Sequence, residues 1–103
     1  MLTKQAAINI SKDFLNDLKS SGVNIRKAYL YGSYAQNRQH EHSDIDIALI
    51  ADEFTGIGPV DIKLLFAALF KYKQVHAKTY SIEDLNEGDP FLEEIIRTGK
   101  MIN

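Results

Sequence analysis

The chain of 103 residues contains no cysteine, has only 2 prolines and 6 glycines, and has no apolar run longer than residues 64–70. Without cysteine it cannot form disulfide bonds or thiolate zinc sites, and it fits a reducing cytoplasm. The run 64–70 is too short to span a bilayer, and the N-terminus becomes charged too early for a signal peptide. A net charge of -2 argues against a broad basic surface for nucleic acid. These absences predict one cytoplasmic domain over residues 1–103, without a membrane segment.

What is present alternates between helical and strand patterns, with no repeat or linker between them. The expected helices cover 4–20, 60–71 and 90–98, with a short helical turn from Ser81, and the expected strands cover 25–32, 43–51, 74–80 and a final edge segment at 100–103. Thr3 and Asp89 are expected N-caps, the latter because proline follows it. The fold class predicted from this order is α/β (α+β), a small mixed β-sheet with helices packed on it.

The strand expected at residues 43–51 carries two carboxylates on one face. Because side chains alternate along a strand, Asp44, Asp46, Ala48 and Ile50 share a face, while the opposite face is uniformly apolar. An ionised carboxylate in a low-dielectric interior needs a partner or a metal ion. The charged start of this face therefore indicates a strand that opens into a cleft.

Two carboxylates at i and i+2 can bind one cation, and Mg²⁺ commonly takes one or two carboxylates together with water and substrate phosphates. The segment before the strand supplies a complementary feature. Gly32 permits close approach of the backbone, Ser33 adds a hydroxyl donor, and residues 33–37 can begin a short helix whose N–H groups face an anion. Together with Asp44 and Asp46, they predict a site for a nucleoside triphosphate and Mg²⁺.

The ordered set of Gly32-Ser33, Ala35 and the Ser-Asp-Ile-Asp of residues 43–46 resembles the signature of the nucleotidyltransferase superfamily related to DNA polymerase beta. The chain is most similar to the minimal nucleotidyltransferases, which are small single domains commonly encoded beside a HEPN-domain protein. The length and the order of elements extend this resemblance over nearly the whole chain. It implies the nucleotidyltransferase fold.

The resemblance also implies roles for the matching residues. Gly32 and Ser33 would bind the triphosphate, Ser43 would steady the loop that enters the metal strand, and Asp44 and Asp46 would act as catalytic ligands of one or two Mg²⁺ ions. The implied reaction transfers a nucleoside monophosphate, expected to be AMP from ATP, to a hydroxyl of a partner protein. The expected partner is a HEPN toxin, for which this chain would be the antitoxin.

The chain departs from the family pattern in three places. Gln36-Asn37 replaces a basic residue and a glycine, which removes a positive charge unless Arg38 replaces it, although asparagine tolerates the left-handed conformation. His76 stands where a third carboxylate is usual, and histidine is a poor magnesium ligand. The alternative is therefore a catalytically weak or inactive module of the same fold that acts by binding its partner or a nucleotide.

Plainer interpretations apply to several other features. The acid pair alone could be a solvated strand end. His40 and His42 are expected in a solvated loop, although a position beside the cleft would let them touch phosphate. The apolar run 64–70 is expected in the core, with part of that face left for a protein interface. Both homo- and hetero-oligomers remain open.

Overall fold

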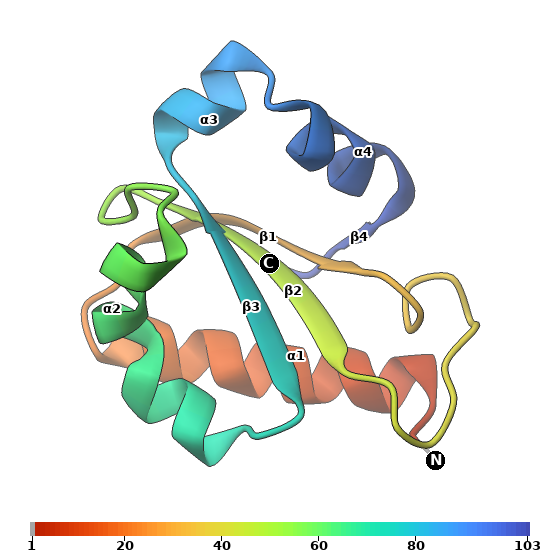
Figure 1. The fold of residues 1–103 in the computed structure, drawn as a ribbon. Helices are drawn as coiled ribbons and strands as arrows, with labels where there is room; N and C mark the ends of the chain where they lie inside the picture. The colour runs from red at the N-terminus through yellow and green to blue at the C-terminus, as the bar shows by residue number, and fades with distance from the viewer. Residues whose placement is uncertain (1) are drawn as a thin grey trace.

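A four-stranded mixed sheet organises residues 2–103, which are the residues described by the computed structural model (Figure 1). The elements in chain order are α1 (Lys4–Ser20), β1 (Ile25–Tyr31), β2 (Ile45–Ala51), α2 (Gly58–Lys71), β3 (Val75–Tyr80), α3 (Ile82–Glu87), α4 (Pro90–Thr98) and β4 (Lys100–Met101). The strand order is β3-β2-β1-β4, with β1 antiparallel to β2 and β4, and β3 parallel to β2. The predicted α/β (α+β) class with a mixed sheet is confirmed.

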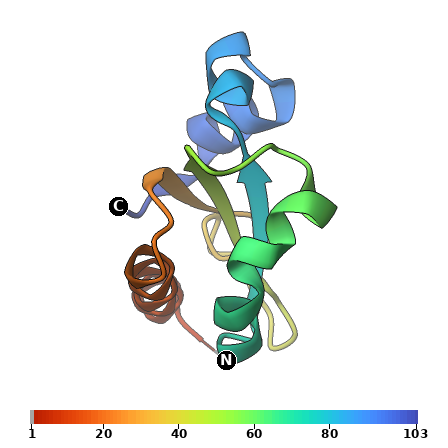
Figure 2. The ribbon, with the colours of Figure 1, turned by 90° about the vertical axis from the view of Figure 1, so that its left-hand side faces the viewer.

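The two faces of the sheet are covered by different helices, as Figure 2 shows from the side. The larger core joins α1 and α2 to one face, where Ile45, Ile47 and Leu49 of β2 are fully buried. A smaller core joins α4 to the other face, where Ala48 and Ile50 are buried. The alternation predicted for this strand is confirmed, and Asp46 lies on the α4 side because its side chain shares the face of Ala48.

The helix starts follow the capping residues expected from the sequence. The hydroxyl of Thr3 accepts a backbone N–H at 3.1 Å at the start of α1, and Asp89, followed by Pro90, accepts one at 3.0 Å at the start of α4. Ser81 and Asp84 form a reciprocal capping box at the start of α3. These local bonds fix where each of these helices begins, and the cap at Ser81 also marks the end of β3.

The apolar run 64–70 is not a continuous core segment, which corrects the prediction. Within it only Leu65 and Ala68 are buried, whereas the side chains of Phe66 and Phe70 are 64% and 68% exposed. The cause is geometric: α2 presents a single stripe to the sheet, and a helix that is apolar on its other sides leaves those sides in water. Part of this face is therefore left uncovered by the domain itself, and its use as a protein interface stays a prediction.

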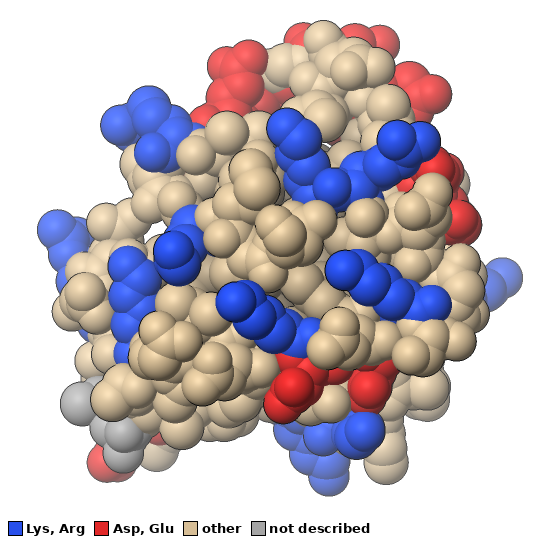
Figure 3. Space-filling model, turned by 180° about the vertical axis from the view of Figure 1, so that it is seen from behind, with Lys and Arg blue, Asp and Glu red and all other residues tan. Residues whose placement is uncertain are grey.

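Charged residues are mixed over the surface. Seen from behind, Asp and Glu side chains gather over the end of the molecule formed by α3 and α4, while Lys and Arg are spread across the middle (Figure 3). This face does not form one broad basic surface. Among residues 2–103, no helix has the length and apolar character that crossing a membrane requires.

Candidate active site

Gly32 and Asp46 approach each other at the point where β1 ends. Gly32 has a φ of +74°, and a Cβ placed on it would lie only 2.4 Å from Oδ2 of Asp46. The position thus requires glycine for two reasons, because L side chains rarely adopt this conformation and because the carboxylate occupies the space. The glycine of the Gly-Ser corner makes room for the acid of the neighbouring strand.

Residues 33–37 form a series of tight turns and not the short helix expected from the sequence. The N–H of Gln36 is shared between the carbonyls of Gly32 and Ser33, both at 3.2 Å, and the N–H of Arg38 returns to the carbonyl of Ser33 at 2.8 Å. Asn37 adopts a φ of +54°, which confirms that it accepts the left-handed conformation. That residue breaks the helical path, so the chain closes into a loop.

Like the start of a helix, the turn has backbone N–H groups that lack an acceptor within the protein. Within residues 2–103, the backbone N–H groups of Ser33, Tyr34 and Ala35 donate to no carbonyl or side chain. The ring of Tyr34 is buried and anchors the turn, while Ser33 is partly exposed. Three consecutive N–H groups without an acceptor, directly after Gly32, are the kind of donor set that binds an anion.

Asp46 lies at the centre of a row of three residues across the sheet, paired with Tyr31 on β1 and His76 on β3. Its side chain is 26% exposed, and its Oδ1 lies 3.4 Å from Nδ1 of His76. Burial raises the pKa of Asp46, His76 partly offsets that effect, and the charge of Asp44 raises the pKa further. Burial, followed by the charge of Asp46, also raises the pKa of Tyr31. The predicted position of His76 beside the acids is confirmed.

Asp44 lies one residue before β2, exposed to solvent, which corrects the predicted strand start by moving it from 43 to Ile45. Ser43 is 9% exposed and closes the preceding loop. Its hydroxyl accepts the N–H of His40 at 2.9 Å, and its own N–H donates to the carbonyl of His40 at 2.9 Å. These bonds hold the loop that carries Asp44 and so position the first carboxylate.

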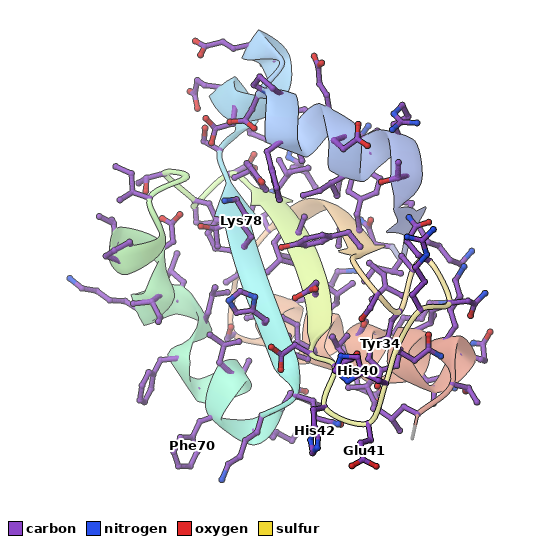
Figure 4. All side chains as sticks on the ribbon, turned by 45° about the vertical axis from the view of Figure 1, so that its right-hand side comes forward. Tyr34, His40, Glu41, His42, Phe70 and Lys78 are labelled. Carbon is purple, nitrogen blue, oxygen red and sulfur yellow. The ribbon has the colours of Figure 1, made fainter. Side chains whose placement is uncertain are left out.

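Two residues of this loop point outward, whereas Nδ1 of His40 accepts the N–H of His42 at 3.3 Å. His40, Glu41 and His42 lie at the tip, and Figure 4 shows Glu41 and His42 directed away from β2. His42 contacts Glu41 at 3.2 Å, with both side chains largely exposed. The interpretation as a solvated loop fits this arrangement.

Lys78 is a residue of the site face that the sequence interpretation missed. It pairs with Ala48 on β2, so its side chain lies on the same face as Asp46 and His76. Figure 4 shows Lys78 on β3. Its Nζ lies 5.0 Å from the ring centroid of Phe91 on α4, a distance typical of a cation–π contact. The signal was present in the sequence, because the period of two that placed His76 on this face also places the lysine two residues later.

Gln36, which stands where the family pattern has a basic residue, makes a structural contact. Its side-chain amide donates to the carbonyl of Thr98 at 3.1 Å, which ties the turn to the end of α4. Arg38 is exposed on the same loop. Lys78 is therefore a cation that β3 places on the face of Asp46, two residues after His76.

The chemistry of the acid pair fits Mg²⁺. Among residues 2–103 there is no cluster of three or more His, Cys, Asp or Glu side chains suited to a metal ion, so the protein offers two carboxylates and not a complete cage. Mg²⁺ commonly binds in this way, with water and phosphate oxygens filling the remaining positions. Burial raises the pKa of Asp46, and a divalent cation held by the pair would oppose that effect.

The sequence matches the family model described as Polymerase beta, Nucleotidyltransferase, over residues 12–103. The chain belongs to this family. A comparison with curated protein sequences gave no match.

Solved structures show the same fold. A protein assigned as a nucleotidyltransferase from Sulfolobus solfataricus aligns with a TM-score of 0.66 and 18% identity, over 82% of this chain and 75% of its own. A toxin–antitoxin structure with AMP-PNP aligns with a TM-score of 0.63 and 26% identity, over 93% of this chain and 72% of its own. A mutant of the toxin–antitoxin MntA–HpeT aligns with a TM-score of 0.60 and 20% identity, over 89% and 71%. The resemblance to minimal nucleotidyltransferases is thereby confirmed.

Proposed function

We propose that the chain is a Mg²⁺-dependent nucleotidyltransferase that transfers AMP from ATP to a hydroxyl of a partner protein, and that it is the antitoxin of a toxin–antitoxin pair with a HEPN toxin. The observation that carries this proposal is the fit of Gly32 against Asp46 beside three free N–H groups. Family membership supports the transfer chemistry. The similarity to a toxin–antitoxin structure with AMP-PNP, an analogue of ATP, supports the nucleotide and the partner.

Each part of the site then has a task in binding the nucleotide. The free N–H groups of residues 33–35 and the hydroxyl of Ser33 bind phosphate oxygens, and Lys78 adds a positive charge on the same face. Asp44 and Asp46 hold Mg²⁺. When bound, the metal ion neutralises phosphate charge and polarises the α-phosphate.

The transfer itself is an in-line displacement at the α-phosphorus. A bond forms between the acceptor oxygen and phosphorus, and the bond from phosphorus to the oxygen bridging the α- and β-phosphates breaks. Pyrophosphate leaves with that electron pair. The hydroxyl proton passes to Nε2 of His76, which carries the lone pair when Nδ1–H is directed at Asp46.

The test uses the purified chain, Mg²⁺, labelled nucleoside triphosphates and the product of the neighbouring gene. We expect label from ATP on that protein, and we expect the combined Asp44→Asn and Asp46→Asn variant to lose it. Label that survives this double substitution would contradict the proposal. Asp52→Asn is the matched control. It changes a carboxylate directly after β2 that pairs with Arg26 of β1, and this variant should label the partner protein as the wild-type chain does.

A second candidate is neutralisation of the partner by contact alone. The observation that favours it is the presence of His76, and not a third carboxylate, beside Asp46. If the double Asn variant still neutralises the partner in cells while binding it normally in solution, contact is sufficient. If neutralisation is lost while binding is kept, catalysis is required.

A further inference from the structure

The outer edge of β3 is unpaired within the described residues, because β3 ends the strand order β3-β2-β1-β4. The carbonyl of Gln74 accepts the N–H of Ile45 at 2.8 Å, so the backbone groups of the even-numbered residues of β3 face β2. Those of Ala77 consequently face the open edge. Within residues 2–103, no loop, helix or side chain bonds to the N–H or the carbonyl of Ala77.

A groove of about 320 Å³ lies between this edge and α2, which runs alongside β3 in Figures 1 and 2. Its α2 wall is apolar and consists of Ile62, Leu65 and Leu69. Its ionisable lining residues are His76 and Lys78, both of which can carry positive charge. The groove therefore combines a free strand edge, an apolar wall and a basic rim.

The groove borders the candidate active site through His76, which belongs to both. His76 lines the groove and also lies 3.4 Å from Asp46. A segment bound along the outer edge of β3 would thus lie next to His76, with β3 between it and Asp46. The apolar wall is also incompletely covered by the domain, since Ile62 is 47% exposed.

We propose that this groove binds an extended segment of the acceptor protein as an added strand on β3, and that this segment carries the hydroxyl that receives the nucleotide. The inference rests on the proposed function and names the docking mode of the acceptor. The segment has acidic residues next to its hydroxyl residue, because the charged lining of the groove is basic. Addition of a strand to a sheet edge satisfies main-chain groups and leaves alternate side chains to give specificity.

The geometry of strand addition explains how the hydroxyl reaches the acids. An added strand lies about 4.8 Å from β3, and its side chains alternate between the two faces of the sheet. One set faces the side of Ala77 and the apolar wall, and the other faces the side of His76 and Asp46. The acceptor residue belongs to the second set, where its oxygen attacks the α-phosphorus, pyrophosphate leaves and His76 takes the proton, as in the transfer described above.

The test compares two groove variants with one matched control. Ile62→Lys places a charge in the groove, and Ala77→Pro removes the outward N–H, which an edge strand tolerates. Leu64→Lys is the control, because Leu64 is 42% exposed on the same helix but lines a different groove, toward α1. Affinity for the product of the neighbouring gene and for AMP-PNP with Mg²⁺ is measured by calorimetry.

We expect both groove variants to weaken binding of the partner protein at least tenfold, the control to change it less than twofold, and AMP-PNP affinity to stay within twofold throughout. Hydrogen exchange of the wild-type chain adds a measurement free of folding defects. The amides of Ala77 and Thr79 should exchange at least tenfold more slowly in the complex than in the free chain.

The outcomes separate this inference from the proposed function. If transfer occurs but both variants bind the partner normally and the amide of Ala77 exchanges at an unchanged rate, the docking mode is wrong and the function stands. If the amide is protected but no label is transferred, the docking mode stands and the function is wrong. If the chain alone forms a dimer that Ala77→Pro abolishes, the edge binds a second copy and the inference is overturned.

Discussion

Nδ1 of His76 lies 3.4 Å from Oδ1 of Asp46, so the acid that is central to the candidate site has a histidine and not a third carboxylate as its neighbour on β3. The histidine only partly compensates for burial, because the pKa of Asp46 remains raised. The ionised form of Asp46 is therefore disfavoured in the folded protein. Burial of Asp46 beside His76 thus costs the folded protein some stability at neutral pH.

The first prediction follows from that raised pKa. When the pKa of an aspartate is higher in the folded than in the unfolded state, the protein loses stability as the pH rises through the folded pKa. Ionised Asp46 therefore destabilises the metal-free protein at pH 7. We expect Asp46→Asn to increase the free energy of unfolding at pH 7 by up to about 1 kcal/mol in the presence of a chelator. Denaturant unfolding at pH 7 measures the change. The exposed Asp13→Asn is the control, and a loss of stability in Asp46→Asn as large as 1 kcal/mol would contradict the argument.

The second prediction concerns Gly32, whose missing side chain leaves space for the carboxylate of Asp46. Gly32→Ala introduces both an unfavourable φ and a Cβ at 2.4 Å from Oδ2, so we expect a loss of about 3 kcal/mol. Gly22→Ala is the matched control: its φ is +98° but nothing lies within 4 Å of the added Cβ, so the expected loss is about 1 kcal/mol.

The difference between these two variants isolates the contact with Asp46. Adding Asp46→Ala to Gly32→Ala should recover most of it, as thermal or denaturant unfolding of the double variant will show. Equal losses in the two single variants would mean that the carboxylate contact contributes nothing.

The third prediction assigns a binding role to Lys78. Lys78 and Lys73 both place Nζ over a phenylalanine ring, at 5.0 Å and 5.3 Å, but only Lys78 lies on the face of Asp46. We expect Lys78→Ala to weaken binding of ATP with Mg²⁺ by about tenfold, with a smaller effect at high salt. Lys73→Ala should change it by less than twofold. Calorimetry at two salt concentrations makes the comparison, and equal effects of the two substitutions would rule out a specific role.

The sequence was sufficient for features that depend on local chemistry. The caps at Thr3 and Asp89, the alternation along β2 and the left-handed Asn37 follow from side-chain type and period, and all three are observed. The acid pair and the Gly-Ser corner were found in the same way, because their spacing along the chain is short. Their proximity in space then follows from the pairing of β1 with β2.

Features that depend on packing partners were harder to predict. The exposure of Phe66 and Phe70 depends on how far α2 overlaps the sheet. The spacing of apolar residues along the helix does not indicate that overlap. The turn at residues 33–37 closes into a loop because Asn37 adopts a left-handed conformation, and the residue types of this segment did not distinguish that outcome from a helix start. The free edge of β3 and the groove beside it are properties of strand order, which the sequence alone left open.

The last prediction concerns Asp61, a carboxylate in the first turns of α2 that is 1% exposed and belongs to the fold and not to the acid pair. It accepts the N–H and hydroxyl of Thr55 at 2.8 and 2.9 Å, the N–H of Gly56 at 3.0 Å, and the hydroxyl of Thr79 at 2.7 Å. Burial alone would raise the pKa of Asp61, but these hydrogen bonds outweigh it and lower the pKa. The carboxylate thus joins the loop before α2 to β3.

An aspartate with a lowered folded pKa stabilises the protein above its unfolded pKa, near 3.9, and that contribution is lost as the pH falls toward the folded value. We expect Asp61→Asn to lower the free energy of unfolding at pH 7 by about 2–3 kcal/mol, because the amide cannot accept all four bonds. We also expect the loss of stability between pH 5 and pH 3 to be shallower in this variant than in the wild-type chain. Denaturant unfolding across that range, with Asp13→Asn as the exposed control, measures both effects. An unchanged slope would show that the hydrogen bonds to Asp61 do not favour its ionised form.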